Sequence, residues 1–284
     1  MRIKLKTVTK ILIIVCFIGL SLLLYPTVSN YLNEKNSTRA ISTYVAEMDS
    51  YDEEQFKEAW NNAVIYNEDL AKQENVFLLP EKMISRYQDN LNITGTGIMG
   101  YIEIPKLDVS LPIYHGTSDS VLQRAIGHID WSSLPVGGES THCVVSGHRG
   151  LPSARLFTDI DKLREGDTFE LIVLDTKLTY EVDQIRTVLP NEVDELQIVN
   201  GKDYCTLVTC TPYGINTHRL LVRGHRIESI KGEAHAVSEA VIIDELIVAS
   251  VLAVPILFIL VMAVMLKKPE KKSATKKDSI KAEV

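Results

Sequence analysis

Cys210 has the sequence surroundings that a cysteine nucleophile requires. It ends the apolar run at residues 204–210, and a Thr-Pro-Tyr-Gly turn follows it. A thiol at the end of a strand is held rigidly and remains accessible, which suits nucleophilic catalysis. The competing interpretation, a buried structural cysteine, fits Cys205 better. Because Cys205 and Cys210 are five residues apart, a regular strand directs them to opposite faces, and they do not form a disulfide.

His148 and Arg219 are candidates for the proton carrier and the anion-binding group that such a thiol needs. His148 lies in a glycine-flanked turn after the apolar run at residues 143–146, so it also occupies a strand end. Spacing alone favours His148 without excluding the other six histidines. Arg219 begins the last apolar run of this region. Its guanidinium is permanently charged, so it binds a carboxylate or an oxyanion but does not act as a base.

The segment from His142 to Arg149 allows two other interpretations. It fits the His-Cys-x5-Arg pattern of cysteine phosphatases, whose loop must curl its backbone N–H groups around a phosphate. Val144 and Val145 favour an extended strand instead, and no Ser or Thr follows the arginine. A zinc site at this segment lacks a second ligand pair with zinc spacing. We therefore predict neither a phosphatase nor a metal site, and no cofactor.

Two apolar runs with basic flanks predict a membrane protein. Residues 246–266 lack charged side chains and span about 31 Å as a helix, close to the thickness of a bilayer core. The lysines that follow this run indicate a cytoplasmic tail. Residues 11–25 fit either a cleaved signal peptide or a retained anchor. We expect a catalytic region outside the cell membrane and both termini in the cytoplasm, unless the first segment is cleaved.

Composition limits the classes of protein that this chain can be. Its 284 residues are 45% hydrophobic and 24% charged, which excludes a collagen-like, low-complexity or wholly disordered chain. The net charge is −7, and basic residues concentrate at the two ends, so the middle is strongly acidic. An acidic middle does not attract phosphate backbones, and nucleic acid is not an expected partner.

The spacing of apolar residues predicts helices first and strands afterwards. Residues 30–92 show helical spacing, and the turn-forming residues 92–97 end this region. From residue 98, short apolar runs alternate with Gly, Pro, Asn and Asp clusters, which predicts seven or eight strands in a closed or nearly closed barrel. The resulting boundaries are a basic end with the first membrane segment at 1–28, a helical region at 29–95, a barrel at 96–230, a linker at 231–245, a second membrane segment at 246–266 and a basic tail at 267–284.

Several motifs in this chain resemble those of sortases, and more narrowly class C, the pilin-polymerising sortases. They are TLVTC at 206–210 with Arg219 downstream, SGHRGLP at 146–152, LFTD at 156–159, GYIEIPK at 100–106 and LPIYHG at 111–116. The resemblance covers about residues 95–230. It implies a mainly β fold, a closed eight-stranded sortase-type β-barrel with short helices, preceded by a helical segment and flanked by two membrane segments.

The resemblance also implies residue roles and partners. Cys210 would be the nucleophile, His148 the acid/base and Arg219 the oxyanion or substrate clamp. The implied reaction cleaves an LPxTG-like sorting signal between Thr and Gly, holds the pilin as a thioacyl enzyme and releases it to a lysine of the next pilin subunit as an isopeptide bond. Pilin subunits and membrane lipid are thus the expected partners.

One departure from class C concerns the lid that usually covers the cysteine. Residues 68–87 contain no Asp-Pro-aromatic motif, so we expect any lid here to be held weakly, with Phe77 or Leu78 as its inserting side chain. Two alternatives to pilus assembly stay open. One is a housekeeping-type sortase that attaches proteins to the cell wall, and the other is a membrane-anchored adhesion or scaffold module without activity.

Overall fold

The computed structural model describes residues 5–228 of the chain. Residues 5–24 belong to one compact unit and residues 25–228 to another. The predicted linker, second membrane segment and basic tail lie outside the described residues, as do the last two residues of the predicted barrel region. The account of the fold therefore concerns the N-terminal helix and the unit that carries Cys210.

Helix α1 (Leu5–Met48) is continuous across the expected boundary at residue 28. Its segment Ile11–Met48 is long and apolar enough to cross a membrane, by length and composition. Leu12, Leu22 and Leu23 expose 62–77% of their surface, an arrangement that favours lipid over water around them. The prediction of an apolar N-terminal helix is confirmed, and it fits a membrane anchor.

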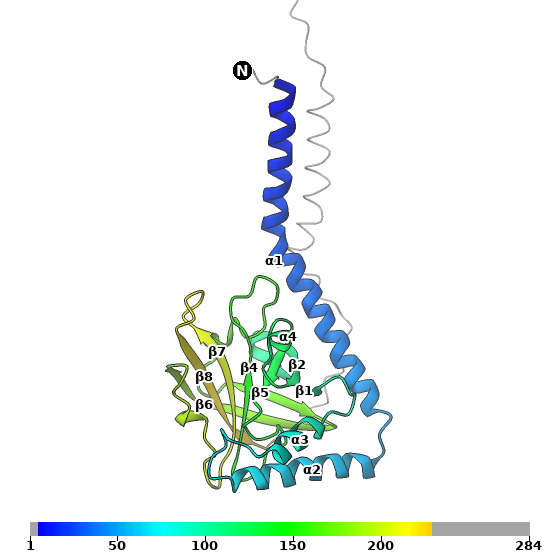
Figure 1. Ribbon diagram of the computed structural model, residues 1–284, viewed down its shortest axis with the longest axis vertical. Helices are drawn as coiled ribbons and strands as arrows, with labels where there is room; N and C mark the ends of the chain where they lie inside the picture. Colours follow the sequence, from blue (N-terminus) through cyan, green and yellow to red (C-terminus); the bar gives the residue numbers. More distant parts are fainter. Residues whose placement is uncertain (1–4, 229–284) are drawn as a thin grey trace, which may run out of the picture. The chain divides into compact units, whose positions relative to one another are not determined.

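Two further helices precede the barrel, as predicted for residues 30–92. Helix α2 (Glu53–Ala71) begins with a capping box in which Asp52 and Gln55 bond each other's backbone N–H groups. Helix α3 (Glu81–Asp89) buries Met83 and Tyr87. In Figure 1, α2 lies across one end of the barrel. These helices thus pack an apolar face on the barrel and leave the opposite barrel end to loops.

Eight strands close into a barrel in the order β1-β2-β3-β4-β7-β8-β6-β5. The β2–β3 and β4–β7 pairs are parallel, and the other pairs are antiparallel. The predicted mainly β, eight-stranded closed barrel is confirmed. The strands are β1 (Ile98–Ile104), β2 (Val109–His115), β3 (Ile126–His128), β4 (Thr141–Ser146), β5 (Thr168–Val173), β6 (Thr176–Val188), β7 (Asp203–Thr211) and β8 (His218–Ile227).

Short helices lie between the strands of the barrel, and one strand was not predicted from the sequence pattern. The four single-turn elements are η1 (Pro105–Leu107), α4 (Asp119–Leu122), η2 (Ile160–Lys162) and η3 (Asp194–Leu196). Strand β3 has only three residues, too few for an alternating pattern to be recognised. Its pairing with β2 and β4 comes from barrel closure rather than from its own composition.

Side chains on the two faces of β4, β7 and β8 have different surroundings. Inside the barrel, Leu207 and Val222 join the main core, together with the stacked rings of Phe169 and Tyr180. On the outer face lies a separate cluster, here called the outer cluster, of Val144, Leu196, Val208 and Leu221. Because side chains alternate along a strand, these two clusters identify which residues point inward and which point outward.

Tyr44 connects helix α1 to the barrel. Its hydroxyl donates to the Met99 carbonyl oxygen at 3.1 Å and accepts from the Leu174 N–H at 2.7 Å. The residue is 1% exposed, and burial raises its pKa well above the usual value. The phenol therefore stays protonated and satisfies two buried backbone groups at once.

Tyr44→Phe should lower stability because it leaves the Met99 carbonyl and the Leu174 N–H buried without a partner. We expect a loss of about 1–3 kcal/mol, which lowers Tm by several degrees. Thermal unfolding of the full chain in detergent, followed by near-UV circular dichroism, measures this. Tyr51→Phe is the control, because Tyr51 packs on Phe56 and its hydroxyl makes no hydrogen bond within the described residues. Equal Tm values for the two variants would contradict this role of Tyr44.

Candidate active site

Cys210 and Arg219 lie directly opposite each other on the antiparallel strands β7 and β8. Opposed residues of an antiparallel pair point to the same face. Cys210 follows Val208 by two residues, and Arg219 precedes Leu221 by two, so both share the face of the outer cluster. Cys210 is a free, partly buried thiol. The structure therefore brings the sulfur and the guanidinium to the same outer edge of the barrel.

His148 lies two residues beyond the end of β4, the strand on the other side of β7. In the parallel β4–β7 pair, Ser146 is in register with Val208. The ladder continues past β4, since the Gly147 N–H donates to the Val208 carbonyl at 3.0 Å and the Thr209 hydroxyl donates to the Gly147 carbonyl at 2.7 Å. Two positions beyond Ser146, His148 is thus level with Cys210. By register, the three sequence candidates therefore lie at the same end of adjacent strands.

Local packing explains the glycine before His148. A Cβ added to Gly147 would lie 2.8 Å from Ile126 and 2.8 Å from the buried Phe157 ring, so no larger residue fits without displacement. Phe157 also donates its N–H to the His148 carbonyl at 3.1 Å. The histidine backbone is therefore fixed by a close contact on one side and a hydrogen bond on the other.

Among residues 5–228, the hydrogen bonds of the Arg219 guanidinium all come from one nitrogen, Nη1. Nη1 donates to the carbonyls of His218 at 3.1 Å and Asn216 at 3.3 Å. Within residues 5–228, no carboxylate forms an ion pair with it. The remaining donors are available for an anion or a developing oxyanion, for which a planar guanidinium is suited.

Cys143 and Cys205 occupy the barrel interior and differ from Cys210 in their surroundings. They are in-register neighbours on β4 and β7, 1% and 0% exposed. Burial raises the pKa of the Cys205 thiol well above its usual value. The prediction that Cys205 and Cys210 point to opposite faces of one strand is confirmed, and only Cys210 reaches the outer face.

His142 has a structural environment that fits neither the phosphatase nor the zinc interpretation. It lies within strand β4, which is extended through Val144 and Val145 and does not curl. Its Nδ1 donates to the Gln197 carbonyl at 2.9 Å, and its Nε2 accepts from the Thr206 hydroxyl at 2.7 Å. Both ring nitrogens are thereby occupied. Among residues 5–228, no group of three or more metal-ligating side chains is found.

The segment between α2 and α3 places one of its two candidate side chains on the barrel. The Phe77 ring contacts the Trp131 ring in an edge-to-face arrangement at 5.0 Å, and Trp131 packs against the outer cluster. Leu78 is 78% exposed. An ion pair between Asp69 and Arg86, at 2.8 Å, joins the helices on either side of this segment. Phe77 thus lies on the outer face, against Trp131.

Arg149 makes contacts in this region that the sequence did not predict. It forms an ion pair with Asp161 and a hydrogen bond to Thr211, the residue after Cys210. Its position directly after His148 in the GHRG segment was the available signal.

Comparison with known proteins identifies the family. The Sortase domain model matches residues 102–227. Sortase C1 from Streptococcus agalactiae is 52% identical, with a TM-score of 0.66, and the alignment covers 68% of this chain and 100% of that one. The chain belongs to the sortase family. Sortases are cysteine transpeptidases, and the solved structures that this sortase matches at 36–52% identity are class C enzymes.

Two other relatives extend this comparison. Sortase C from Clostridium perfringens, solved with the C-terminal cell wall sorting motif, is 46% identical with a TM-score of 0.59, covering 67% of this chain and 98% of that one. Sortase D from Bacillus subtilis is 30% identical over 131 residues, or 45% of this chain. The chain spans 63% of the length of sortase D, just under two thirds.

His142 should make the stability of this sortase dependent on pH. Burial lowers its pKa to about 4 in the folded protein, whereas an unfolded histidine titrates near 6.5. The unfolded state therefore binds more protons between these values, and stability is lost as the pH falls from 6.5 towards 4. We expect His142 to lower the free energy of unfolding by about 2 kcal/mol when the pH falls from 7 to 5.

Urea unfolding of wild type and His142→Gln at pH 7 and pH 5 measures this contribution. The variant should lose less stability on acidification than wild type. Thr206→Val is the matched control, because it removes a partner of the imidazole but keeps the titrating group, so its pH dependence should persist. An unchanged pH dependence in His142→Gln would contradict the assignment.

Proposed function

We propose that this sortase is a membrane-anchored transpeptidase that joins pilin subunits through isopeptide bonds, using Cys210, His148 and Arg219. The observation that carries the proposal is the strand register, which brings the free thiol of Cys210, the imidazole of His148 and the guanidinium of Arg219 to the same end of β4, β7 and β8. These are the three groups that acyl transfer through a cysteine requires.

In the first half-reaction, His148 accepts the Cys210 proton and the thiolate attacks the threonine carbonyl carbon of an LPxTG-like sorting signal. Arg219 donates to the oxyanion of the tetrahedral intermediate. When the Thr–Gly bond breaks, the imidazolium of His148 gives its proton to the leaving glycine amine. The pilin is then held as a thioester on Cys210, which retains the energy of the acyl bond for a second transfer.

In the second half-reaction, a lysine amine of the next pilin subunit attacks the thioester carbonyl. His148 takes a proton from this amine, and Arg219 again stabilises the oxyanion. Collapse of the intermediate forms the isopeptide bond and expels the Cys210 thiolate, which regains its proton from His148. Each proton removed is returned, so the reaction needs no cofactor.

Relatives support this choice of substrates. The Clostridium perfringens sortase C was solved with a C-terminal cell wall sorting motif, and the structure of Streptococcus pneumoniae sortase C concerns pilin substrate specificity. At 44–46% identity to these two proteins, we extend the same substrate class to this chain. Attachment of surface proteins to the cell wall, as by a housekeeping-type sortase, would give products linked to peptidoglycan instead of lysine-linked pilin ladders.

Membrane placement is part of the proposal. The apolar helix α1 supports an N-terminal anchor in the cell membrane with the sortase barrel outside the cell. We infer a linker, a second membrane segment at residues 246–266 and a basic cytoplasmic tail from the sequence. Two such segments would hold the barrel close to membrane lipid.

Cys210→Ala should abolish both the acyl enzyme and the pilin polymer, whereas Cys143→Ala and Cys205→Ala should retain activity as far as they fold. The physical reason is that only Cys210 lies on the outer face, while the other two are buried in the barrel. Mass spectrometry of the full chain incubated with a sorting-signal peptide and with pilin measures both products. An acyl adduct on Cys143 or Cys205 in the Cys210→Ala protein would contradict the role assigned to Cys210.

Arg219→Lys should lower turnover by about 10²-fold or more, because lysine keeps the charge but loses the planar donor pair that matches an oxyanion. Steady-state cleavage of a sorting-signal peptide measures this. Arg186→Lys, on the neighbouring strand β6, is the control. Arg223→Lys is not suitable as a control, because Arg223 is paired with Asp183. Wild-type turnover in Arg219→Lys would mean that a point charge is enough.

A further inference from the structure

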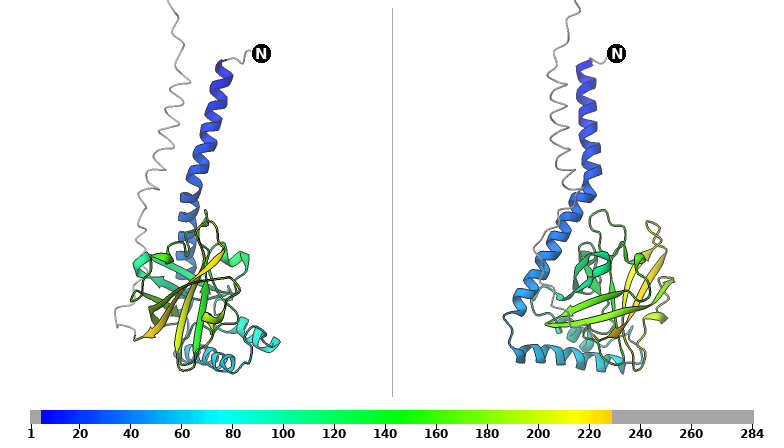
Figure 2. Two further views of the ribbon diagram at one scale, coloured as in Figure 1. Left: turned by 90° about the vertical axis from the view of Figure 1, so that its left-hand side faces the viewer. Right: turned by 180° about the vertical axis from the view of Figure 1, so that it is seen from behind.

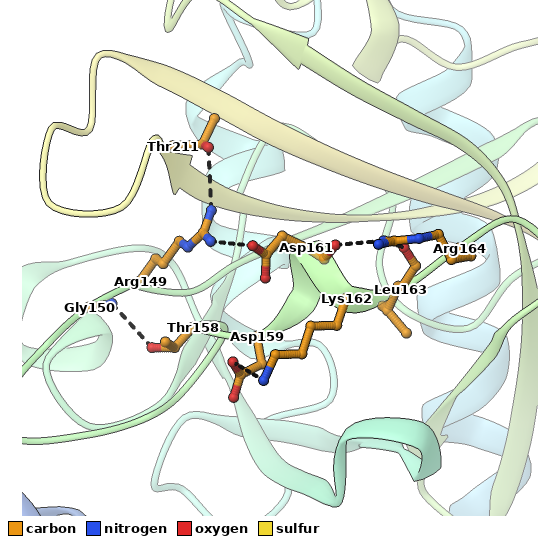
Figure 3. Close-up of polar contacts among 9 residues, drawn as sticks. All are labelled: Arg149, Gly150, Thr158, Asp159, Asp161, Lys162, Leu163, Arg164 and Thr211. Atoms are coloured by element: carbon orange, nitrogen blue, oxygen red, sulfur yellow. Dashed lines mark hydrogen bonds and ion pairs between the residues drawn. The ribbon is translucent and has the colours of Figure 1, made fainter.

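Arg149 joins the loop that carries His148 to the end of the strand that carries Cys210. Its Nη1 donates to the Thr211 hydroxyl at 3.3 Å, and its Nη2 forms an ion pair with Asp161. Figure 3 shows the guanidinium between these two partners. The side chain is 11% exposed, and its guanidinium carbon lies 5.9 Å from the centre of the Tyr213 ring. Arg149 thus connects its own loop, which follows β4, to the end of β7 and to the loop that follows β7.

The Arg149–Thr211 bond is the second of two contacts that flank the His148–Cys210 pair. One position earlier in the same register, the Thr209 hydroxyl donates to the Gly147 carbonyl at 2.7 Å. One position later, Arg149 donates to Thr211. With both neighbours bonded, the intervening pair is held in register even though it lies beyond the last residue of β4.

The other partner of Arg149 is fixed to the barrel core. Asp161 lies in η2, between the fully buried Ile160 and the fully buried Leu163 two residues on. The loop is closely packed as well, because a Cβ on Gly150 would lie 3.0 Å from the Tyr213 ring. The Asp161 side chain is 41% exposed, but its backbone is fixed by these buried neighbours, and it provides the anchor from which Arg149 reaches Thr211.

Arg149 does not occupy the position of a catalytic group. In the alternating pattern of β4 and β7, Arg149 and Thr211 belong to the side opposite His148 and Cys210. Its Nε is buried and has no hydrogen-bond partner among residues 5–228, which carries a desolvation cost. Arg149 therefore lies one position from the His148–Cys210 pair and does not share its face.

We propose that Arg149 is a positioning residue that holds His148 level with Cys210 by connecting Asp161 to Thr211. The proposal rests on the proposed function, because it assumes that His148 and Cys210 work as a pair. Arg149 contributes through His148, so its effect on Cys210 reactivity depends on the presence of that imidazole.

The test is a double-mutant cycle in the full chain in detergent, with iodoacetamide as the probe and mass spectrometry of the Cys210 peptide as the readout. A small alkylating reagent reports the reactivity of the thiol without requiring a bound sorting signal. The proteins are wild type, Arg149→Gln, His148→Ala and the double variant. Thr211→Val, which removes only the hydrogen bond beside Cys210, is a second route to the same effect, and thermal unfolding checks that each variant is folded.

We expect Arg149→Gln and His148→Ala each to slow alkylation by about tenfold, and the double variant to be within about twofold of His148→Ala alone. Thr211→Val should slow it in the same direction. Arg155→Gln is the matched control, because Arg155 lies in the same loop and pairs with Asp159 at the surface, 49% exposed. Its rate should equal that of wild type.

The positioning role would be overturned if Arg149→Gln slowed alkylation equally in the wild-type and His148→Ala backgrounds. It would also be overturned if Arg149→Gln and Thr211→Val were both alkylated at the wild-type rate. If wild type still forms a Cys210 acyl enzyme with a sorting-signal peptide in that case, the proposed function stands and only the role of Arg149 fails. A wild-type alkylation rate in His148→Ala, together with no acyl enzyme in wild type, would overturn both.

Discussion

The parallel pairing of β4 with β7 is the interaction on which the site depends. His148 and Cys210 are far apart in sequence, and this ladder aligns the ends of the two strands that lead to them. Strand β8 then adds Arg219 through its antiparallel pairing with β7. Because β5 and β6 are formed from the chain between β4 and β7, the parallel pair requires the rest of the barrel to close around it. Figure 2 shows the loops after β4 and β7 at the end of the barrel away from α2.

The two faces of these strands give the same residue type different chemistry. Cys143 and Cys205 point into the barrel, where burial disfavours a charged thiolate at Cys205. Cys210 is on the same strand as Cys205, but it faces outward beside an imidazole and a guanidinium. Strand alternation, rather than the identity of the residue, therefore separates the buried thiol of Cys205 from the thiol that we propose as the nucleophile.

The helical region supports the barrel through polar contacts that are buried. The Asn67 amide exchanges two hydrogen bonds with the backbone of Leu134, at 2.7 and 3.0 Å. The Tyr87 hydroxyl donates to the His128 carbonyl at 3.2 Å and accepts from the Gly116 N–H at 2.9 Å. These buried hydrogen bonds fix α2 and α3 against the barrel.

The sequence alone predicted the three candidate groups of the site, and it determined the apolar N-terminal helix and the mainly β barrel, because each depends on local spacing or on a short motif. The number of strands was predictable to within one, since three-residue β3 carries no periodic signal. Tertiary structure alone decided that β4 lies beside β7. It also decided that both ring nitrogens of His142 form hydrogen bonds, to Gln197 and Thr206, and that Arg149 connects Asp161 with Thr211. Local periodicity reports which face a residue takes, but the choice of a partner strand is set by closure of the whole barrel.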